Sequence, residues 1–70
     1  MTDNLHVRVN GEELSLPRGA SVTALLERLK ISTPRVAVER NREILPKSSY
    51  ASTFLEEGDS FEVVEFVGGG

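Results

Sequence analysis

The sequence predicts a single α+β domain in which one main helix packs on one face of a mixed sheet of four to five strands. Three observations predict it: an alternating hairpin at the start, one amphipathic helix after it, and a final apolar strand. A single helix can bury its apolar stripe only by covering a sheet, so this order of elements is typical of a β-grasp roll. We expect the domain to span residues 1–67, with residues 68–70 as a flexible C-terminal glycine tail.

The first segment, "LHVRVNGEELSL", has the period-two alternation of two half-buried strands. Its alternating apolar residues are Leu5, Val7 and Val9, then Leu14 and Leu16. Asn10-Gly11 lies between the two runs and suits the positive φ angles of a tight hairpin turn. Pro17 cannot donate a ladder hydrogen bond, so we expect the second strand to stop there.

The segment "GASVTALLERLK" is predicted to form the main helix, with Ser21 as its N-cap. One apolar stripe follows the helical spacing and consists of Val22, Leu25, Leu26 and Leu29. Lys30 is expected at the C-terminal end of the helix, where a positive charge is favoured. Pro34 disfavours helix at Thr33 and is expected to end it.

The second half supplies the remaining strands. We expect a third strand in "RVAVERN", a short fourth in "EILP", and a last strand in "SFEVVEFV" that lies centrally beside the first. Residues 47–59 are predicted to form a loop with a turn of helix. Its Tyr50, Phe54 and Leu55 would cover the open end of the core.

Composition excludes several classes of function. The chain has no cysteine and one histidine, so disulfides, thiolate metal sites and chemistry on a protein thiol are excluded, and no metal site is expected. The sequence contains no apolar run long enough to span a bilayer and no secretory signal, which favours a cytoplasmic protein without membrane association.

Charge is distributed unevenly along the chain. All eight bases precede residue 48, and five acids follow: Glu56, Glu57, Asp59, Glu62 and Glu65. An acidic C-terminal part argues against nucleic acid as a partner and favours docking on a basic protein surface. The alternative is a solvated face that keeps a small protein soluble.

The last strand is predicted to have one buried and one partner-binding face. Phe61 and Val63 should point under the helix, whereas Val64 and Phe66 should point to a face that nothing covers. The predicted partner-binding residues are Val64, Phe66, Val67, Glu62 and Glu65. Alternatively, Phe66 folds over the edge of the sheet as ordinary packing.

The terminal glycines Gly68, Gly69 and Gly70 suggest chemistry at the C-terminus. A glycine has no Cβ, so its carboxylate can enter a narrow slot, and three extended residues reach at most about 10 Å. The tail carries no side chain that could activate the carboxylate, so an external enzyme would have to adenylate it. The alternative is a frayed terminus or a cloning remnant.

Three stretches resemble the ThiS family of sulfur carriers in thiamine biosynthesis, which are ubiquitin-like: "VNGEE", "VAVERNREILPKSSY" and "LEEGDSFEVVEFVGGG". Asn41 and Pro46 match the family's central pattern, and the Leu-x-x-Gly-Asp turn and Val-Gly-Gly-Gly end are more specific. Tyr50 stands where the family often has Trp. Small subunits of molybdopterin synthase share the fold and a Gly-Gly end, but they resemble the central stretch less.

The resemblance implies a carrier and not an enzyme, without catalytic residues of its own and without a bound cofactor. A ThiF-type enzyme would adenylate Gly70 with ATP and magnesium, and sulfur drawn from cysteine by a desulfurase would convert it to a thiocarboxylate. A ThiG-type thiazole synthase would then take the sulfur, and the carrier alone is expected to be a monomer. The open alternatives are a carrier for another pathway such as molybdopterin, a ubiquitin-like protein modifier, and a plain interaction module.

Overall fold

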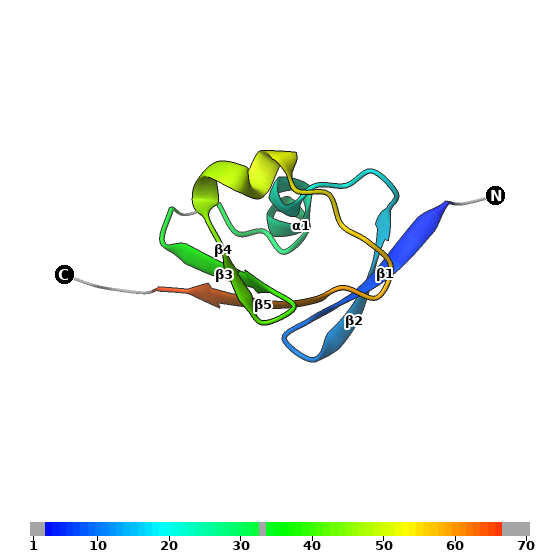
Figure 1. Cartoon of the computed structure of the whole chain (residues 1–70), viewed down its shortest axis with the longest axis horizontal. Helices are drawn as coiled ribbons and strands as arrows, with labels where there is room; N and C mark the ends of the chain where they lie inside the picture. Colours follow the sequence, from blue (N-terminus) through cyan, green and yellow to red (C-terminus); the bar gives the residue numbers. More distant parts are fainter. Residues whose placement is uncertain (1–2, 33, 67–70) are drawn as a thin grey trace.

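The computed structural model describes residues 3–32 and 34–66, and it has the predicted architecture of a five-stranded mixed sheet under one helix (Figure 1). The sheet has the strand order β2-β1-β5-β3-β4. The elements are β1 (Asn4–Val9), β2 (Glu12–Pro17), α1 (Val22–Arg28), β3 (Val36–Arg40), β4 (Glu43–Leu45), the 3-10 helix η1 (Lys47–Ser52) and β5 (Ser60–Glu65).

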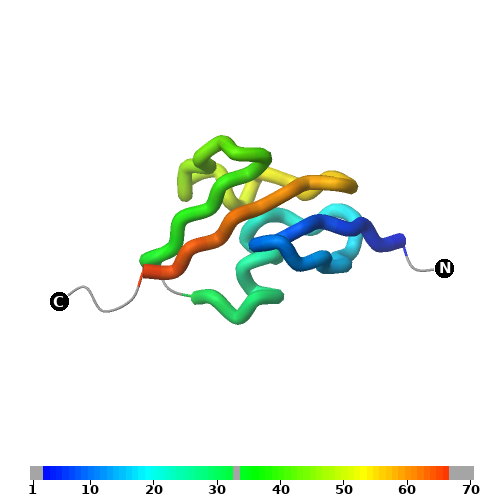
Figure 2. Tube along the Cα trace, turned by 90° about the horizontal axis from the view of Figure 1, so that it is seen from below, coloured from blue at the N-terminus to red at the C-terminus, as the bar shows by residue number. Residues whose placement is uncertain are grey.

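The last strand lies in the middle of the sheet, as predicted. β5 runs parallel to β1 and antiparallel to β3, and Figure 2 shows it passing between them. The hairpin of β1 and β2 turns at Asn10 and Gly11, whose φ angles are 51° and 86°. Both predictions therefore hold: the tight turn with two positive φ angles, and the pairing of the first strand with the last.

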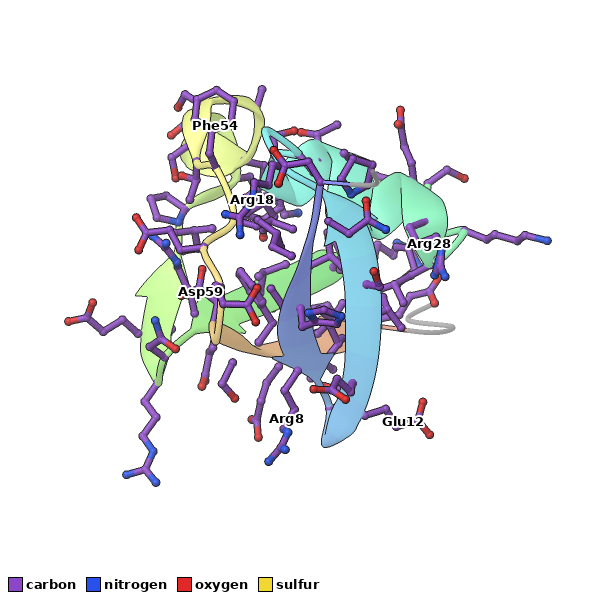
Figure 3. All side chains as sticks on the ribbon, turned by 90° about the vertical axis from the view of Figure 1, so that its right-hand side faces the viewer. Arg8, Glu12, Arg18, Arg28, Phe54 and Asp59 are labelled. Atoms are coloured by element: carbon purple, nitrogen blue, oxygen red, sulfur yellow. The ribbon has the colours of Figure 1, made fainter. Side chains whose placement is uncertain are left out.

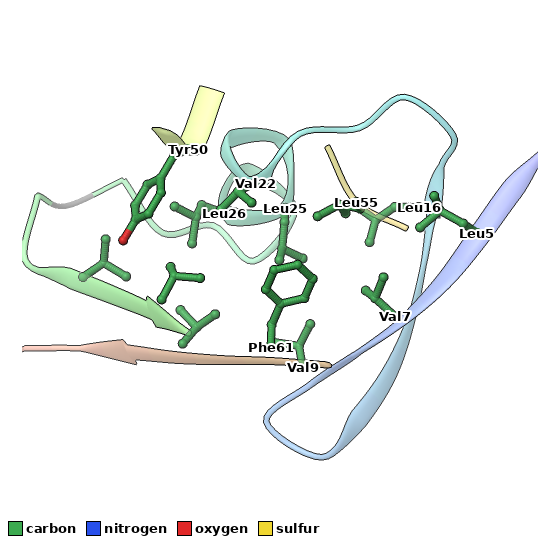
Figure 4. Close-up of a cluster of buried hydrophobic side chains, with 13 residues drawn as sticks. Leu5, Val7, Val9, Leu16, Val22, Leu25, Leu26, Tyr50, Leu55 and Phe61 are labelled. Carbon is green, nitrogen blue, oxygen red and sulfur yellow. The ribbon is translucent and has the colours of Figure 1, made fainter. Parts of the chain in front are cut away.

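The core lies between α1 and one face of the sheet (Figure 4). β1, β3 and β5 contribute alternate residues to it, and Phe61 is among the largest fully buried side chains, with an exposed fraction of 1%. The buried apolar residues are Leu5, Val7, Val9, Leu16, Val22, Leu25, Leu26, Val36, Val38, Tyr50, Leu55, Phe61 and Val63.

The segment after β4 covers the core differently from the prediction. Tyr50 and Leu55 are buried, as expected, but Phe54 is 57% exposed, so the expectation that Phe54 covers the core was wrong. Residue 54 forms a β-bridge to Ser21, and its neighbour Leu55 then turns inward. Figure 3 shows Phe54 at the periphery of the molecule.

Burial of the Tyr50 ring raises the pKa of its hydroxyl above 10.0, with a smaller opposing effect from the backbone of Val38.

The helix begins where the sequence predicts but ends earlier. The Ser21 hydroxyl accepts a hydrogen bond from the backbone N–H of Ala24 at 3.2 Å. At the other end, the backbone N–H groups of Lys30 and Ile31 bond to the carbonyls of Glu27 and Leu26, which is a Schellman motif. Lys30 has a φ of 61° and lies just past the helix, so a left-handed turn and not Pro34 ends it.

Replacing Lys30 with glycine should stabilise the fold. Glycine adopts a positive φ without the Cβ penalty, and the exposed Lys30 side chain makes no packing contribution to the core. We expect Lys30→Gly to raise the free energy of unfolding by about 0.5–1 kcal/mol in urea denaturation. The control is Glu27→Gly, at an exposed position in the last turn of the helix, where glycine should instead cost up to about 1 kcal/mol. Equal losses for both variants would contradict the role assigned to Lys30.

Candidate functional site

The candidate site is the outer face of β5, the strand that leads to the predicted tail. Phe61 and Val63 point into the core, whereas Val64 and Phe66 are 53% and 56% exposed. The prediction that this strand divides into one buried and one uncovered face is therefore confirmed. The interpretation that Phe66 folds over the sheet edge as ordinary packing does not fit its exposure.

The uncovered face extends beyond the last strand, onto residues that the sequence analysis did not include. Ala37 on β3 stands opposite Val64, and Glu39 stands opposite both Glu62 on β5 and Ile44 on β4. Ile44 is 79% exposed. The alternation in "EIL" could have identified it, because Leu45 packs against the core and its neighbour must then point outward.

Two carboxylates face each other on this surface. Glu39 and Glu62 are direct cross-strand partners, and like charges in that arrangement destabilise a sheet. Within the described residues, neither side chain forms a salt bridge. The combination of exposed apolar side chains and two unneutralised carboxylates makes this face suitable for a partner that brings apolar and basic groups.

Not all five acids of the C-terminal part are available for docking. Asp59 is 6% exposed, and its carboxylate accepts hydrogen bonds from Arg40 Nε at 3.1 Å, Asn41 Nδ2 at 3.1 Å and the Glu56 backbone N–H at 2.9 Å. Arg40 Nη2 also lies 3.0 Å from Asp59 Oδ2. This ion pair between a half-buried guanidinium and a buried carboxylate ties β3 to the turn before β5, so the interpretation of Asp59 as a docking acid was wrong.

The neighbouring acids are also engaged within the chain. Glu57 accepts a hydrogen bond from the His6 backbone N–H at 2.9 Å and lies 3.5 Å from His6 Nδ1. Glu56 Oε2 lies 3.9 Å from Arg40 Nη2. Although no base follows Lys47 in the sequence, the fold brings Arg40 and His6 to these acids. Glu62 and Glu65 remain as the acids without a salt bridge in the described part of this segment.

The predicted partner-binding residues do not share one face. Glu62, Val64 and Phe66 are on the outer face, but Glu65 stands opposite the buried Val36 and so belongs to the helix side of the sheet. Glu65 is exposed there because it lies at the end of the strand. Val67, Gly68, Gly69 and Gly70 lie outside the described residues, so their predicted roles stay predictions.

Asn10 has a second role that the sequence analysis missed. Its side-chain Nδ2 donates to the Val63 carbonyl at 3.1 Å, and its Oδ1 accepts from the Val63 N–H at 2.9 Å. The Asn10 backbone N–H also bonds to the Phe61 carbonyl. The side chain therefore continues the ladder between β1 and β5 beyond the end of β1, and it fixes the strand that leads to the tail.

Among the described residues, no group of three or more His, Cys, Asp or Glu side chains is placed to hold a metal ion. In that same part of the chain, no helix is both long and apolar enough to cross a membrane.

The fold and the exposed strand face define a β-grasp protein of the ubiquitin-like class. The crystal structure of a thiamine biosynthesis protein (ThiS) from Geobacter metallireducens matches with a TM-score of 0.74 and 36% identity, covering 94% of this chain and all of that one. The family model described as the ThiS family matches residues 5–70. The chain belongs to the ThiS family.

Two sequence relatives differ in length. The sulfur carrier protein ThiS of Bacillus subtilis is 34% identical over 65 residues, which cover 91% of this chain and 98% of the relative. A thiazole synthase of Paramagnetospirillum magneticum is 50% identical over 62 residues, covering 89% of this chain but 19% of the relative. The chain thus spans about a fifth of that thiazole synthase.

Phe61 on β5 and Phe66 directly after it should respond differently to truncation. Phe61→Ala should lower the free energy of unfolding by about 3–5 kcal/mol, because it leaves a cavity in the core. Phe66→Ala should change stability by less than about 1 kcal/mol, because the ring is half exposed and lies on an uncovered face. Chemical denaturation of both variants tests this. A larger loss for Phe66→Ala than for Phe61→Ala would contradict the assignment of faces.

Proposed function

We propose that this chain is a sulfur carrier of thiamine biosynthesis and that the Gly70 carboxylate is the group that carries the sulfur. The observation that carries the proposal is the ThiS family match, which extends through the glycines to residue 70. A relative of nearly the same length is named as a sulfur carrier. The protein is then a co-substrate of other enzymes and not an enzyme itself.

The proposed chemistry begins at the C-terminal carboxylate. A ThiF-type enzyme, with its own ATP and magnesium, would transfer AMP to this carboxylate and release pyrophosphate. A persulfide sulfur, drawn from cysteine by a desulfurase, would attack the carbonyl and displace AMP. Cleavage of the resulting S–S bond by a thiol would leave a thiocarboxylate on Gly70. No cofactor is required on the chain itself.

We propose that the fold supports this chemistry through the strand that precedes the tail. β5 lies between two neighbouring strands, and its direction determines where the following residues leave the domain. We propose that Val64 and Phe66, with Glu62 beside them, contact the enzyme that receives the tail. Glycines without Cβ atoms would then let the carboxylate reach a narrow active site.

The proposed acceptor of the sulfur is a ThiG-type thiazole synthase. The support is that a protein named thiazole synthase contains a region 50% identical to this chain. We place the reaction in the cytoplasm, with the free carrier as a monomer. Two alternatives differ from this proposal in what happens at Gly70. A carrier for molybdopterin would give its sulfur to a different acceptor, and a ubiquitin-like modifier would be joined through Gly70 to another protein.

The experiment is intact-mass analysis of the chain after incubation with ATP, magnesium, a ThiF-type enzyme and a persulfide donor. We expect a gain equal to the mass difference between sulfur and oxygen, located on Gly70 by fragmentation. An added alanine after Gly70 should abolish the gain, because its Cβ enters the slot and the reactive carbonyl moves. Phe66→Ala should slow the gain at limiting carrier concentration.

Two results would contradict the proposed function. One is an unchanged mass for the chain ending at Gly70 while a known carrier in the same assay reacts. The other is normal adenylation of the alanine-extended chain. Lysine conjugates in place of a free thiocarboxylate would instead identify a protein modifier.

A further inference from the structure

A groove lies on the helix side of the sheet, beside the end of β5. It has a volume of about 330 Å³ and runs between the β1–β2 hairpin and the residues that follow α1. Its apolar lining consists of Val9, Leu14, Leu29, Ile31 and Val63. Two carboxylates, Glu12 and Glu65, also line it, and its described lining contains no base.

One wall of this groove is an open edge of β5. The backbone groups of successive residues in a strand point to alternate sides. The backbone N–H of Asn41 donates to the Ser60 carbonyl, and the N–H of Phe66 donates to the Arg35 carbonyl. The backbone N–H and C=O groups of even-numbered residues along this strand therefore point toward β3. Odd-numbered residues face the side of β1, as the bond from the Asn10 N–H to the Phe61 carbonyl shows.

The ladder on that side ends before the strand does. β1 pairs with β5 at Arg8–Ser60 and Val9–Phe61, and Asn10 then provides side-chain partners for Val63. Glu65 is the next odd-numbered residue. Within the described chain, neither its N–H nor its C=O has a hydrogen-bond partner. In the described part of the chain, β5 therefore has no partner at Glu65 on the side of β1, and Figure 2 shows the strand running on past the end of β1.

We propose that this edge accepts an extended segment of the thiazole synthase as an added strand. The inference deepens the proposed function and rests on it. Added strands gain affinity from main-chain hydrogen bonds and specificity from alternate side-chain pockets. Here the Glu65 backbone supplies the bonds, and the groove accepts an apolar side chain of the incoming strand.

Charge specifies the incoming segment further. Glu12 and Glu65 lie at the groove without a salt bridge in the described residues, so the segment should carry a lysine or arginine. The predicted tail begins three residues after Glu65. A strand paired at Glu65 would therefore hold the partner in register with the residues that enter its active site.

The first test is a matched pair of variants at Glu65. Glu65→Ala removes the carboxylate but keeps the backbone N–H, whereas Glu65→Pro removes both. Proline is tolerated where a strand N–H faces an open edge, so both variants should fold. Calorimetric titration with the thiazole synthase of the same organism should give a dissociation constant about tenfold higher for Glu65→Pro than for Glu65→Ala.

The second test measures the hydrogen bond itself. Amide exchange followed by nuclear magnetic resonance should show a fast Glu65 amide in the free chain and at least about tenfold slower exchange in the complex. The Val64 amide, which faces β3, is the internal control and should be slow in both states. This readout does not depend on a substitution that could redirect the tail.

Each outcome decides the proposal. Tenfold separation of the two variants with protection of the Glu65 amide supports it. Tight binding with an unprotected Glu65 amide and equal affinities of the variants overturns the strand addition and leaves the proposed function intact. No binding of the wild-type chain overturns the partner and the strand addition together. If the free chain is a dimer in which the Glu65 amide is already protected, the edge pairs with a second copy of the chain, and this also overturns the proposal.

Discussion

The position of β5 is the constraint on which the rest of the structure depends. The strand is hydrogen-bonded to β3 along its length and to β1 over its first residues. Where β1 ends, the Asn10 side chain binds both backbone groups of Val63. At the start of β5, the Asn41 side-chain oxygen accepts a hydrogen bond from the Ser60 N–H at 3.0 Å, and Asn41 Nδ2 donates one to the Asp59 carboxylate. Two asparagines in left-handed turns thus hold the strand from opposite edges.

This arrangement separates stability from binding along a single strand. The inward residues Phe61 and Val63 contribute to the core, and the outward residues Val64 and Phe66 leave apolar surface exposed. The facing carboxylates of Glu39 and Glu62 lower the stability of the sheet slightly and give the surface its charge. A strand held on both sides with an exposed outer face suits the proposed role, in which the C-terminus is presented to other enzymes.

Much of this fold could be predicted from local patterns. Period-two alternation predicted both faces of β5, Asn10-Gly11 predicted the hairpin, and the helical stripe predicted the face of α1. What failed depends on contacts between distant residues. Asp59 looks like one of five similar acids until the fold brings Arg40 to it, and Phe54 looks like core until its bridge to Ser21 turns it outward. The second role of Asn10 has no local signal, because its partner Val63 is 53 residues away.

The most direct test of the central claim is amide exchange at Val63 in the variant Asn10→Gly. Glycine adopts the positive φ at this position, so the hairpin is kept while both side-chain hydrogen bonds to Val63 are lost. We predict that the Val63 amide exchanges at least about tenfold faster than in the wild type, whereas the Val64 amide, which faces β3, changes much less. Equal protection of Val63 in both proteins would contradict the account, because β5 would then be fixed without Asn10.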